Sequence, residues 1–290
     1  DVVTTKVDVD SDQQETIGMA RQFVDLFWIT FLNLLPENFG HRAFKKTSKD
    51  GTEVTKAATT YKALEIFYKW DGKFHFEKGI FDGLFTYAWQ CIHNVQAVRN
   101  RKKIASKVLL RAKPDMIVSL GSGSARMVIE YLKHHYCPAL LIDLSQDAIN
   151  YSKSLAASDE FHFNARKNIE WHKDIAQNFG KYLPADRPGK VLFEMVGLLD
   201  YFDDFKAVKF FAQLSSAMKS GDVFCVSNII PNAERPFVEK VIRWKNMHYR
   251  TPEKLKSLLL AGRFKSGEIK LTVDATKIYT IAEIIKGNDL

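Results

Sequence analysis

The sequence of 290 residues predicts an α/β fold, in which a mostly parallel sheet is covered by helices and preceded by an α-helical lobe. From residue 106 onward, short apolar runs alternate with stretches of helical spacing, which is typical of a parallel sheet. The last two apolar runs are separated only by a short polar link, which predicts an antiparallel hairpin at the C-terminal edge of the sheet. Residues 1–105 lack this alternation. We therefore predict a helical cap at 1–105 and an α/β domain at 106–290.

Within the cap, apolar and aromatic residues recur at helical spacing in three stretches. These stretches are Thr16–Leu35, Ala57–Trp70 and Phe81–Val98. Residues 1–14 are polar and predicted to be frayed. Residues 41–56 are polar and charged and include Gly51, so we predict a loop there. The dense aromatic residues between Phe67 and Trp89 favour either core packing or a lid over a site, where aromatic faces would attract a cation.

In the α/β domain each of the first five predicted strands is followed by one or two predicted helices, and the last two strands form the predicted hairpin. The strands are Met116–Leu120, Ala139–Asp143, Ile169–His172, Val191–Met195, Val223–Asn228, Glu268–Val273 and Lys277–Ile285. The helices are Ser124–His134, Gln146–Ala157, Ile175–Tyr182, Phe205–Met218, Glu234–Trp244 and Pro252–Leu260. Ser145 is well placed to cap the second of these helices.

Composition and charge exclude several classes of protein. The longest apolar run, Phe27–Leu35, is too short to span a bilayer. Three well-separated cysteines favour a reducing compartment over a disulfide framework or a zinc site, and no secretory signal is evident, so we expect a cytoplasmic protein. The histidines show no metal spacing. The net charge of +8 is concentrated in residues 99–113, which predicts a helix with a solvated basic face or a docking surface for an anion. No nucleic-acid module is present.

The stretch Met116–Arg126 has the sequence of a buried strand, a glycine turn and the start of a helix. Gly121 allows a tight turn, and Gly123 allows the main chain to approach a ligand closely. A ligand at such a turn lies at the N-terminus of the following helix. This pattern alone is a weak indication of a nucleotide site.

Acidic residues at the ends of later strands strengthen that indication. Asp143 follows the second strand about 20 residues beyond the glycines, where a carboxylate can bind both hydroxyls of a ribose. Asp174 and Glu194 stand at the ends of the next two strands, and the carboxyl ends of parallel strands meet at one edge of a sheet. A capping or surface role for Asp143 is the alternative.

On these residues the chain resembles the class I S-adenosylmethionine-dependent methyltransferases, which share a Rossmann-like sheet. The resemblance covers about residues 106–290. It implies S-adenosylmethionine as cofactor, without a metal. The cofactor-binding residues that it implies are Ser119, Gly121, Ser122, Gly123, Asp143, Leu144, Asp174, Ile175, Glu194 and Met195. Many members carry an acid two residues before the first glycine, where this chain has Ser119, and the loop ends in Ala125 rather than a third glycine.

Two stretches after the fourth and fifth strands indicate where a substrate would bind. They contain GLLDYF at 197–202 and WKNMHYR at 244–250, and together they resemble bacterial methyltransferases that make hydroxy-fatty-acid methyl esters. The catalytic candidates are Asp200, Tyr201, His248, Tyr249 and Arg250. Structural alternatives exist for four of them: Asp200 and Tyr201 would cap and pack a helix, His248 would be an interface residue, and Arg250 would pair with Glu253.

The predicted function is transfer of a methyl group from S-adenosylmethionine to a small, partly apolar molecule by in-line displacement. A general base is needed only for a protonated nucleophile, so a catalytic dyad is not required. Two alternatives remain open. The cofactor's own aminobutyrate chain could cyclise to azetidine-2-carboxylate, releasing methylthioadenosine, or the sheet could bind NAD for an oxidoreductase. The sequence gives no indication of the oligomeric state.

Overall fold

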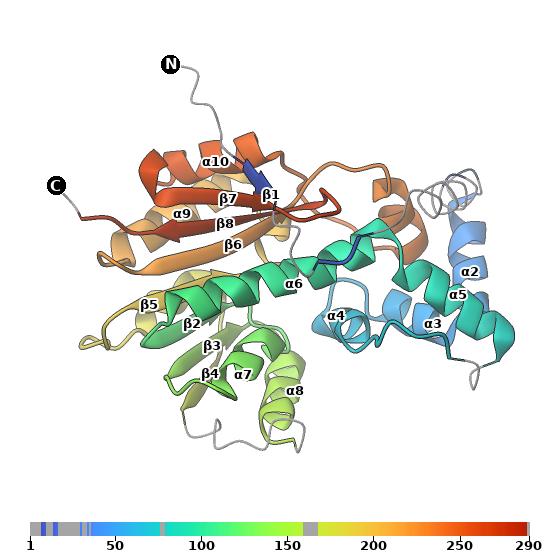
Figure 1. The fold of residues 1–290 in the computed structure, drawn as a ribbon, viewed down its shortest axis with the longest axis horizontal. Coiled ribbons are helices and arrows are strands. Elements are labelled where there is room, and N and C mark those ends of the chain that lie inside the picture. The colour runs from blue at the N-terminus through green and yellow to red at the C-terminus, as the bar shows by residue number, and fades with distance from the viewer. Residues whose placement is uncertain are drawn as a thin grey trace.

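The computed structural model describes residues 7–9, 14–16, 30, 34, 36–75, 79–158 and 168–288 (Figure 1). Most of the helix predicted at Thr16–Leu35 lies outside these residues. The described chain forms one sheet with helices on both faces and a group of shorter helices beyond one end of the strands. None of the helices in these ranges is long and apolar enough to cross a membrane.

A single eight-stranded sheet forms the centre of the fold, with the order β1-β7-β8-β6-β5-β2-β3-β4. The strands are β1 (Val7–Val9), β2 (Met116–Leu120), β3 (Ala139–Asp143), β4 (Ile169–Lys173), β5 (Val191–Met195), β6 (Val223–Ile229), β7 (Ile269–Val273) and β8 (Tyr279–Ile285). All neighbours are parallel except β8, which runs antiparallel to β6 and β7. The predicted fold class is therefore confirmed, and the predicted strands of the α/β domain lie within two residues of the observed ones.

The arrangement of the C-terminal hairpin differs from the prediction in one respect. β8 lies between β6 and β7, and β7 is itself covered by the short parallel strand β1. The hairpin therefore does not form the edge of the sheet, and residues 7–9, predicted to be frayed, are paired. Because β1 comes from the start of the chain, its register with β7 joins residues far apart in sequence, which local patterning cannot show.

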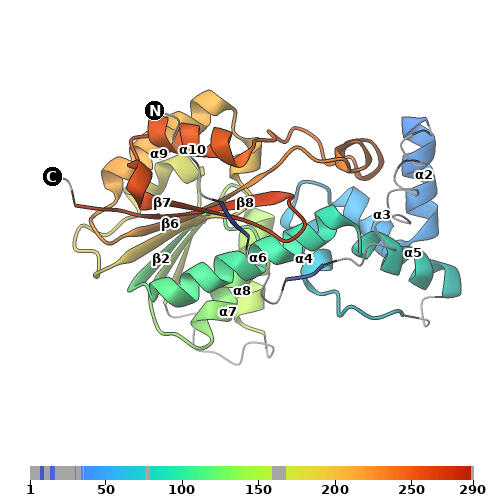
Figure 2. The same ribbon diagram turned by 45° about the horizontal axis from the view of Figure 1, so that its top comes forward.

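Helices cover both faces of the sheet (Figure 2). On one face lie α6 (His93–Ala112), α7 (Arg126–Leu132) and α8 (Gln146–Ala156). On the other face lie η3 (Ala176–Lys181), α9 (Asp204–Ala217) and α10 (Pro252–Ala261), with the short turns η4 (Leu199–Tyr201) and η6 (Ser266–Glu268). The helices predicted at 175–182 and 234–244 are shorter and of other types: η3 is a 3₁₀ helix, and η5 (Phe237–Ile242) is a π-helix.

The cap contains α2 (Glu37–Thr47), α3 (Lys49–Lys56), α4 (Tyr61–Tyr68) and α5 (Ile80–Gln90), which lie beyond one end of the strands in Figure 1. The loop predicted at 41–56 is wrong, because this segment forms most of α2 and all of α3. Ser48 caps α3 by accepting a hydrogen bond from the N–H of Gly51. A Cβ on Gly51 would lie 3.1 Å from the ring of Phe44. The glycine thus serves close helix packing, which the sequence alone does not distinguish from a turn.

Helix α6 runs through residue 105, the predicted boundary between cap and domain. The helix predicted at Phe81–Val98 is divided between α5 and α6. The prediction of a solvated basic face on this segment is wrong for two of its arginines, since Arg99 and Arg101 are both buried. Arg99 pairs with Glu15 at 2.6 Å, and Arg101 reaches the end of the sheet.

Candidate active site

A glycine turn follows β2 and opens into α7, as the sequence predicts. The N–H groups of Gly121 and Ser122 donate to the carbonyl of Ile142 on β3, at 2.9 and 3.0 Å. Gly121 has a φ of +72°, and a Cβ there would lie 2.8 Å from a methyl group of Leu198. A side chain at position 121 is therefore excluded by both backbone conformation and space.

The carboxylate of Asp143 fixes this turn from the end of β3. One oxygen accepts the N–H of Gly123 at 2.8 Å, and the other accepts the N–H of Ser145 at 2.8 Å. Ser145 in turn caps α8, as predicted, by accepting from the N–H of Ala148 at 3.2 Å. Each carboxylate oxygen can accept a second hydrogen bond, so Asp143 can hold the turn and a ligand hydroxyl at the same time.

The residues after β3 and β4 expose apolar surface beside these polar groups. The side chains of Leu144 and Ile175 are 67% and 44% exposed. Asp174 accepts hydrogen bonds from Asn178, Tyr182 and the N–H of Ile175, and the first two chiefly lower its pKa to about 2. Asp174, Leu144 and Ile175 lie outside the lining of the main cavity.

Glu194 lies at the end of β5, beside Ser119 on β2. The two residues are register partners, and the hydroxyl of Ser119 donates to the Glu194 carboxylate, whose other oxygen accepts the N–H of Val196 at 3.1 Å. Burial raises the pKa of Glu194 to about 7. Glu194 borders the cavity, whereas the side chains of Ser119 and Met195 are completely buried within the sheet and its packing.

A cavity of about 1010 Å³ lies between the ends of the strands and the cap. Its floor includes Gly121, Ser122, Gly123, Asp143 and Glu194. Its opposite wall is mostly apolar and aromatic and comes from α4, η5 and the segment after η5: Leu64, Ile66, Phe67, Tyr68, Val238, Ile242, Trp244 and Met247. This volume is at the upper end of the range for small-molecule sites, about 300–1,000 Å³.

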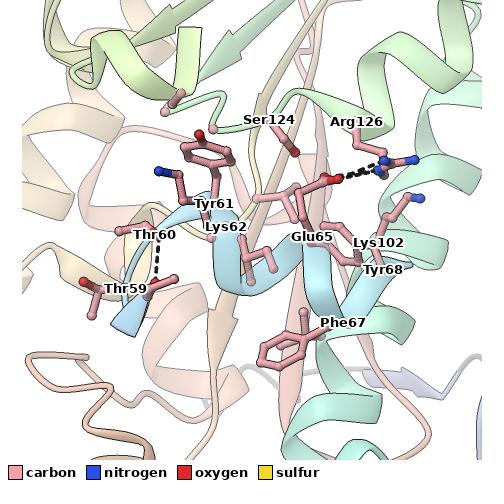
Figure 3. Close-up of a pocket in the computed structure, with 18 of the residues that line it drawn as sticks. Thr59, Thr60, Tyr61, Lys62, Glu65, Phe67, Tyr68, Lys102, Ser124 and Arg126 are labelled. Atoms are coloured by element: carbon pink, nitrogen blue, oxygen red, sulfur yellow. Dashed lines mark hydrogen bonds and ion pairs between the residues drawn. The ribbon is translucent and has the colours of Figure 1, made fainter. Parts of the chain in front are cut away.

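A buried ion pair joins the cap to the α/β part at the side of this cavity (Figure 3). The guanidinium of Arg126, at the start of α7, donates to both oxygens of Glu65 on α4, at 2.8 to 3.0 Å. The hydroxyl of Tyr151 also donates to Glu65, at 2.8 Å. Burial alone would raise the pKa of Glu65, but the hydrogen bonds from Arg126 and Tyr151 outweigh it and lower this pKa.

Sequence reasoning missed this pair, although two signals were present. Glu65 interrupts an apolar stretch of a predicted helix, and Arg126 follows the glycine turn directly. Their separation of 61 residues leaves no local pattern that links the two.

Of the five predicted catalytic residues, the structure brings Asp200 and Tyr201 to the cavity. Asp200 accepts hydrogen bonds from the side chain of Asn228 and the N–H of Ile229, and burial raises its pKa. The indole of Trp244 donates to the hydroxyl of Tyr201 at 2.6 Å. The proton of that hydroxyl can therefore be donated to another acceptor.

The other three candidates lie outside the cavity lining. His248 is exposed, and the guanidinium of Arg235 lies 4.4 Å from the centre of the Tyr249 ring. Arg250 is buried and pairs with Asp204 at 2.9 Å, not with Glu253 as the alternative had it. Conversely, Arg101 borders the cavity, although its segment had been predicted to be solvated. Within the described residues no three potential metal ligands cluster.

Several solved structures have a similar fold, all at low sequence identity to this chain. A possible exported protein from Bordetella parapertussis superposes with a TM-score of 0.64 at 12% identity, over 94% of this chain and 100% of that one. The S-adenosylmethionine-dependent methyltransferase SibL superposes with a TM-score of 0.50 at 12% identity, over 93% and 77% of the chains. A candidate O-methyltransferase from Nostoc punctiforme gives 0.50 at 14%, over 66% and 57%.

No protein-family model and no curated protein sequence matches the chain. At these identities the structural similarities show the fold alone. The resemblance to class I S-adenosylmethionine-dependent methyltransferases is confirmed at that level, with the parallel sheet and the antiparallel strand β8 in place. The cytoplasmic location remains a prediction.

The role of Asp143 leads to a testable expectation for ligand binding. Asp143→Ala removes the acceptor for the Gly123 N–H as well as any contact to ribose hydroxyls, so we expect the affinity for S-adenosylmethionine to fall about ten- to a hundredfold. Calorimetry on the folded variant measures this change. Unchanged affinity would contradict the expectation that Asp143 binds the ribose hydroxyls.

Proposed function

We propose that the protein is an S-adenosylmethionine-dependent methyltransferase that acts on a small, partly apolar molecule by direct in-line displacement. The observation that carries this proposal is the cavity of about 1010 Å³, which joins the glycine turn and Asp143 at one side to an aromatic wall at the other. Such a cavity has room for a nucleoside cofactor and a second molecule in contact. In-line displacement requires this contact and the exclusion of water.

The polar side of the cavity suits the cofactor. Asp143 keeps free acceptor positions for ribose hydroxyls while it holds the N–H of Gly123. Leu144 and Ile175 lie just outside the cavity lining, at the neighbouring strand ends, and their exposed apolar side chains offer faces for a flat adenine ring that extends beyond the cavity. Ser119 and Met195 would support the site from within the sheet, because both are completely buried.

The aromatic side of the cavity suits the methyl acceptor. The rings of Phe67 and Trp244 stack at 6.2 Å, and Trp244 also holds the hydroxyl of Tyr201. Burial raises the pKa of Tyr201 to about 12, so its hydroxyl stays protonated at neutral pH and can donate a hydrogen bond to an acceptor molecule. A carboxylate acceptor would need no general base in this site.

We also propose that residues 1–105 act as a cap that closes the cavity. Supporting this, α4 contributes Phe67 and Tyr68 to the wall, and Glu65 fastens α4 to the glycine-turn helix through Arg126 (Figure 3).

The experiment measures binding and then product. Calorimetry with S-adenosylmethionine, S-adenosylhomocysteine and NAD is expected to show binding of the first two only. The enzyme is then incubated with S-adenosylmethionine alone or with a mixed small-molecule extract, and the released nucleoside is identified by mass spectrometry. We expect S-adenosylhomocysteine only with the extract.

Two outcomes would replace the proposal by its alternatives. Steady release of methylthioadenosine without any extract, lost in Asp143→Ala, would indicate cyclisation of the cofactor's own chain. Binding of NAD in place of S-adenosylmethionine would indicate an oxidoreductase.

A further inference from the structure

Exposed apolar side chains gather at the end of the cap that lies farthest from the sheet, where α2 and α5 are found (Figures 1 and 2). Ile80, Phe81 and Leu84 lie on the first two turns of α5, at a spacing that places them on one side of the helix. All three are more than half exposed, and so are Leu34 and Phe39, before and within the start of α2. An apolar surface exposed in this way marks a site for another protein or for a membrane.

Basic side chains accompany this apolar surface on α2. Between residues 39 and 49 the chain has no acidic residue but several basic ones: His41, Arg42, Lys45, Lys46 and Lys49. A groove of about 420 Å³ lies here, and every described residue that lines it is basic: His41, Arg42, Lys45, Lys46 and Arg243. Phe39, Arg42 and Lys46 are spaced three and four residues apart, so an exposed ring and exposed cations share one side of α2. The groove therefore suits anionic groups that lie beside apolar ones.

The apolar and the basic side chains meet at one corner of the cap. The N–H of Lys49, at the start of α3, donates to Asp82 on the first turn of α5 at 3.0 Å. The hydroxyls of Ser48 and Thr86 are hydrogen-bonded to each other at 2.7 Å. These bonds hold the basic last turn of α2 close to the first two turns of α5. One extended partner can therefore make ionic and apolar contacts here at the same time.

We propose that this corner of the cap, formed by the exposed apolar side chains of α2 and α5 and the basic groove, binds the surface of an anionic lipid membrane. A lipid surface presents phosphates to cations and acyl chains just below them to apolar side chains, which matches the two kinds of side chain found here. The net charge of +8 adds attraction at longer range. An acidic protein surface would pair with the groove but would offer the exposed Ile80 and Phe81 little apolar contact.

The groove adjoins the segment that forms part of the aromatic wall of the cavity. Ile242 and Trp244 line the cavity, whereas Arg243 between them lines the groove. His41 is also bonded to this segment, through the carbonyl of Val241 at 2.8 Å. A lipid headgroup bound in the groove would therefore contact the same segment that forms the cavity wall. The inference goes beyond the proposed function and does not depend on it, because membrane binding is measured without turnover.

Flotation with lipid vesicles measures the binding. We expect the wild-type protein to float with vesicles of phosphatidylglycerol and phosphatidylcholine at low salt, but not with vesicles of phosphatidylcholine alone. Sodium chloride at about 0.5 M should release most of the protein, because salt screens the attraction. Lys45→Gln combined with Lys46→Gln is expected to weaken binding about ten- to thirtyfold, since each cation near an anionic surface adds to the affinity. Phe81→Ser should weaken it about tenfold, because an apolar ring no longer leaves water.

Matched controls lie on α9, which covers the sheet. Phe205 is as exposed as Phe81, at 78%, and Lys206 and Lys209 are exposed on the same helix. Phe205→Ser, and Lys206→Gln combined with Lys209→Gln, remove the same chemical groups away from the cap. These variants should leave vesicle binding within about twofold of wild type, because charges beyond a Debye length from the lipid surface are screened.

Hydrogen exchange on the wild-type protein gives a second measurement, which does not depend on any variant. Anionic vesicles should slow the exchange of amides in α2 and in the first turns of α5. The amides of α9 should exchange at the same rate with and without vesicles.

Several results would overturn the inference. These are failure of the wild-type protein to bind anionic vesicles at low salt, equal binding to vesicles of phosphatidylcholine alone, and equal loss of binding in the variants of α9 and of the cap. If vesicles are not bound but the protein forms a dimer that Phe81→Ser abolishes, the corner joins two copies of the chain instead. If it binds only a soluble polyanion such as heparin, the groove serves an acidic partner and not a membrane.

Discussion

Replacement of Arg126 by methionine is expected to lower the free energy of unfolding by about 3–5 kcal/mol, because the buried Glu65 would keep only the more distant and exposed cation Lys69, at 3.9 Å. Both side chains are only 6% exposed, and three hydrogen bonds join them. The same change would separate α4 from α7 and open the side of the cavity. Urea denaturation followed by circular dichroism measures the loss.

Two further variants identify the cause. Glu65→Leu combined with Arg126→Met removes both charges and should recover much of the lost stability. Arg235→Met breaks a more exposed pair with Glu239 and a contact with the Tyr249 ring, and should cost about 1–2 kcal/mol. If Arg126→Met lowers the free energy of unfolding no more than Arg235→Met does, the Glu65–Arg126 pair does not stabilise the packing of the cap.

The pair also predicts how stability depends on pH. The pKa of Glu65 is lower in the folded protein than its ordinary value of 4.5. The stabilisation is therefore fully present above the unfolded-state pKa and is lost as the pH falls through the folded-state pKa. Arg126→Met should weaken this acid dependence.

Replacement of Arg250 by methionine is expected to lower the free energy of unfolding by about 1–3 kcal/mol, because buried acceptors on Asn228 and Phe202 would lose their donor. The guanidinium pairs with Asp204, donates to the side chain of Asn228 at 3.0 Å, and donates to the carbonyl of Phe202. It thereby ties η4 and α9 to the end of β6. Because Arg250 lies outside the cavity lining, we expect the residual folded protein to bind S-adenosylhomocysteine normally.

If Arg250 is instead catalytic, as the sequence analysis hypothesised, Arg250→Met should keep its stability and lose turnover. Thermal unfolding and nucleoside affinity, measured on one preparation, distinguish the two. A variant that keeps wild-type stability but loses turnover would favour the catalytic hypothesis. Lys254→Met, which removes another partner of Asp204 at 2.8 Å on a half-exposed side chain, is the control.

Much of the fold was predictable because its signals are local. Apolar runs predicted β2, β3 and β5 with their observed bounds, and Ser145 was correctly placed as a helix cap. The errors arise where a local signal has two structural meanings. Gly51 and its polar neighbours suggested a loop, but they form helices whose few apolar residues, Phe44 and Val54, are enough to bury one side.

The candidate site was predictable only in part, for a related reason. The turn at Gly121 and the acids at strand ends follow from topology, since parallel strands end at one edge. The cap's contribution depends on contacts between distant segments: Glu65 with Arg126, or Tyr201 with Trp244, 43 residues apart. The burial of Arg101 could not be predicted either, because the helical spacing of this basic segment does not show which face of the helix packs against the sheet.

Helix α6 has a consequence for how the protein can be divided. Its twenty residues span about 30 Å and pack with the cap at one end and with the sheet at the other. A rotation of the cap about residue 105 would have to break the backbone hydrogen bonds of a continuous helix. The cap therefore cannot be exchanged as a module at residue 105. A chimaera joined at this residue would combine parts of α6 from two proteins, so a crossover that preserves the fold must lie outside α6.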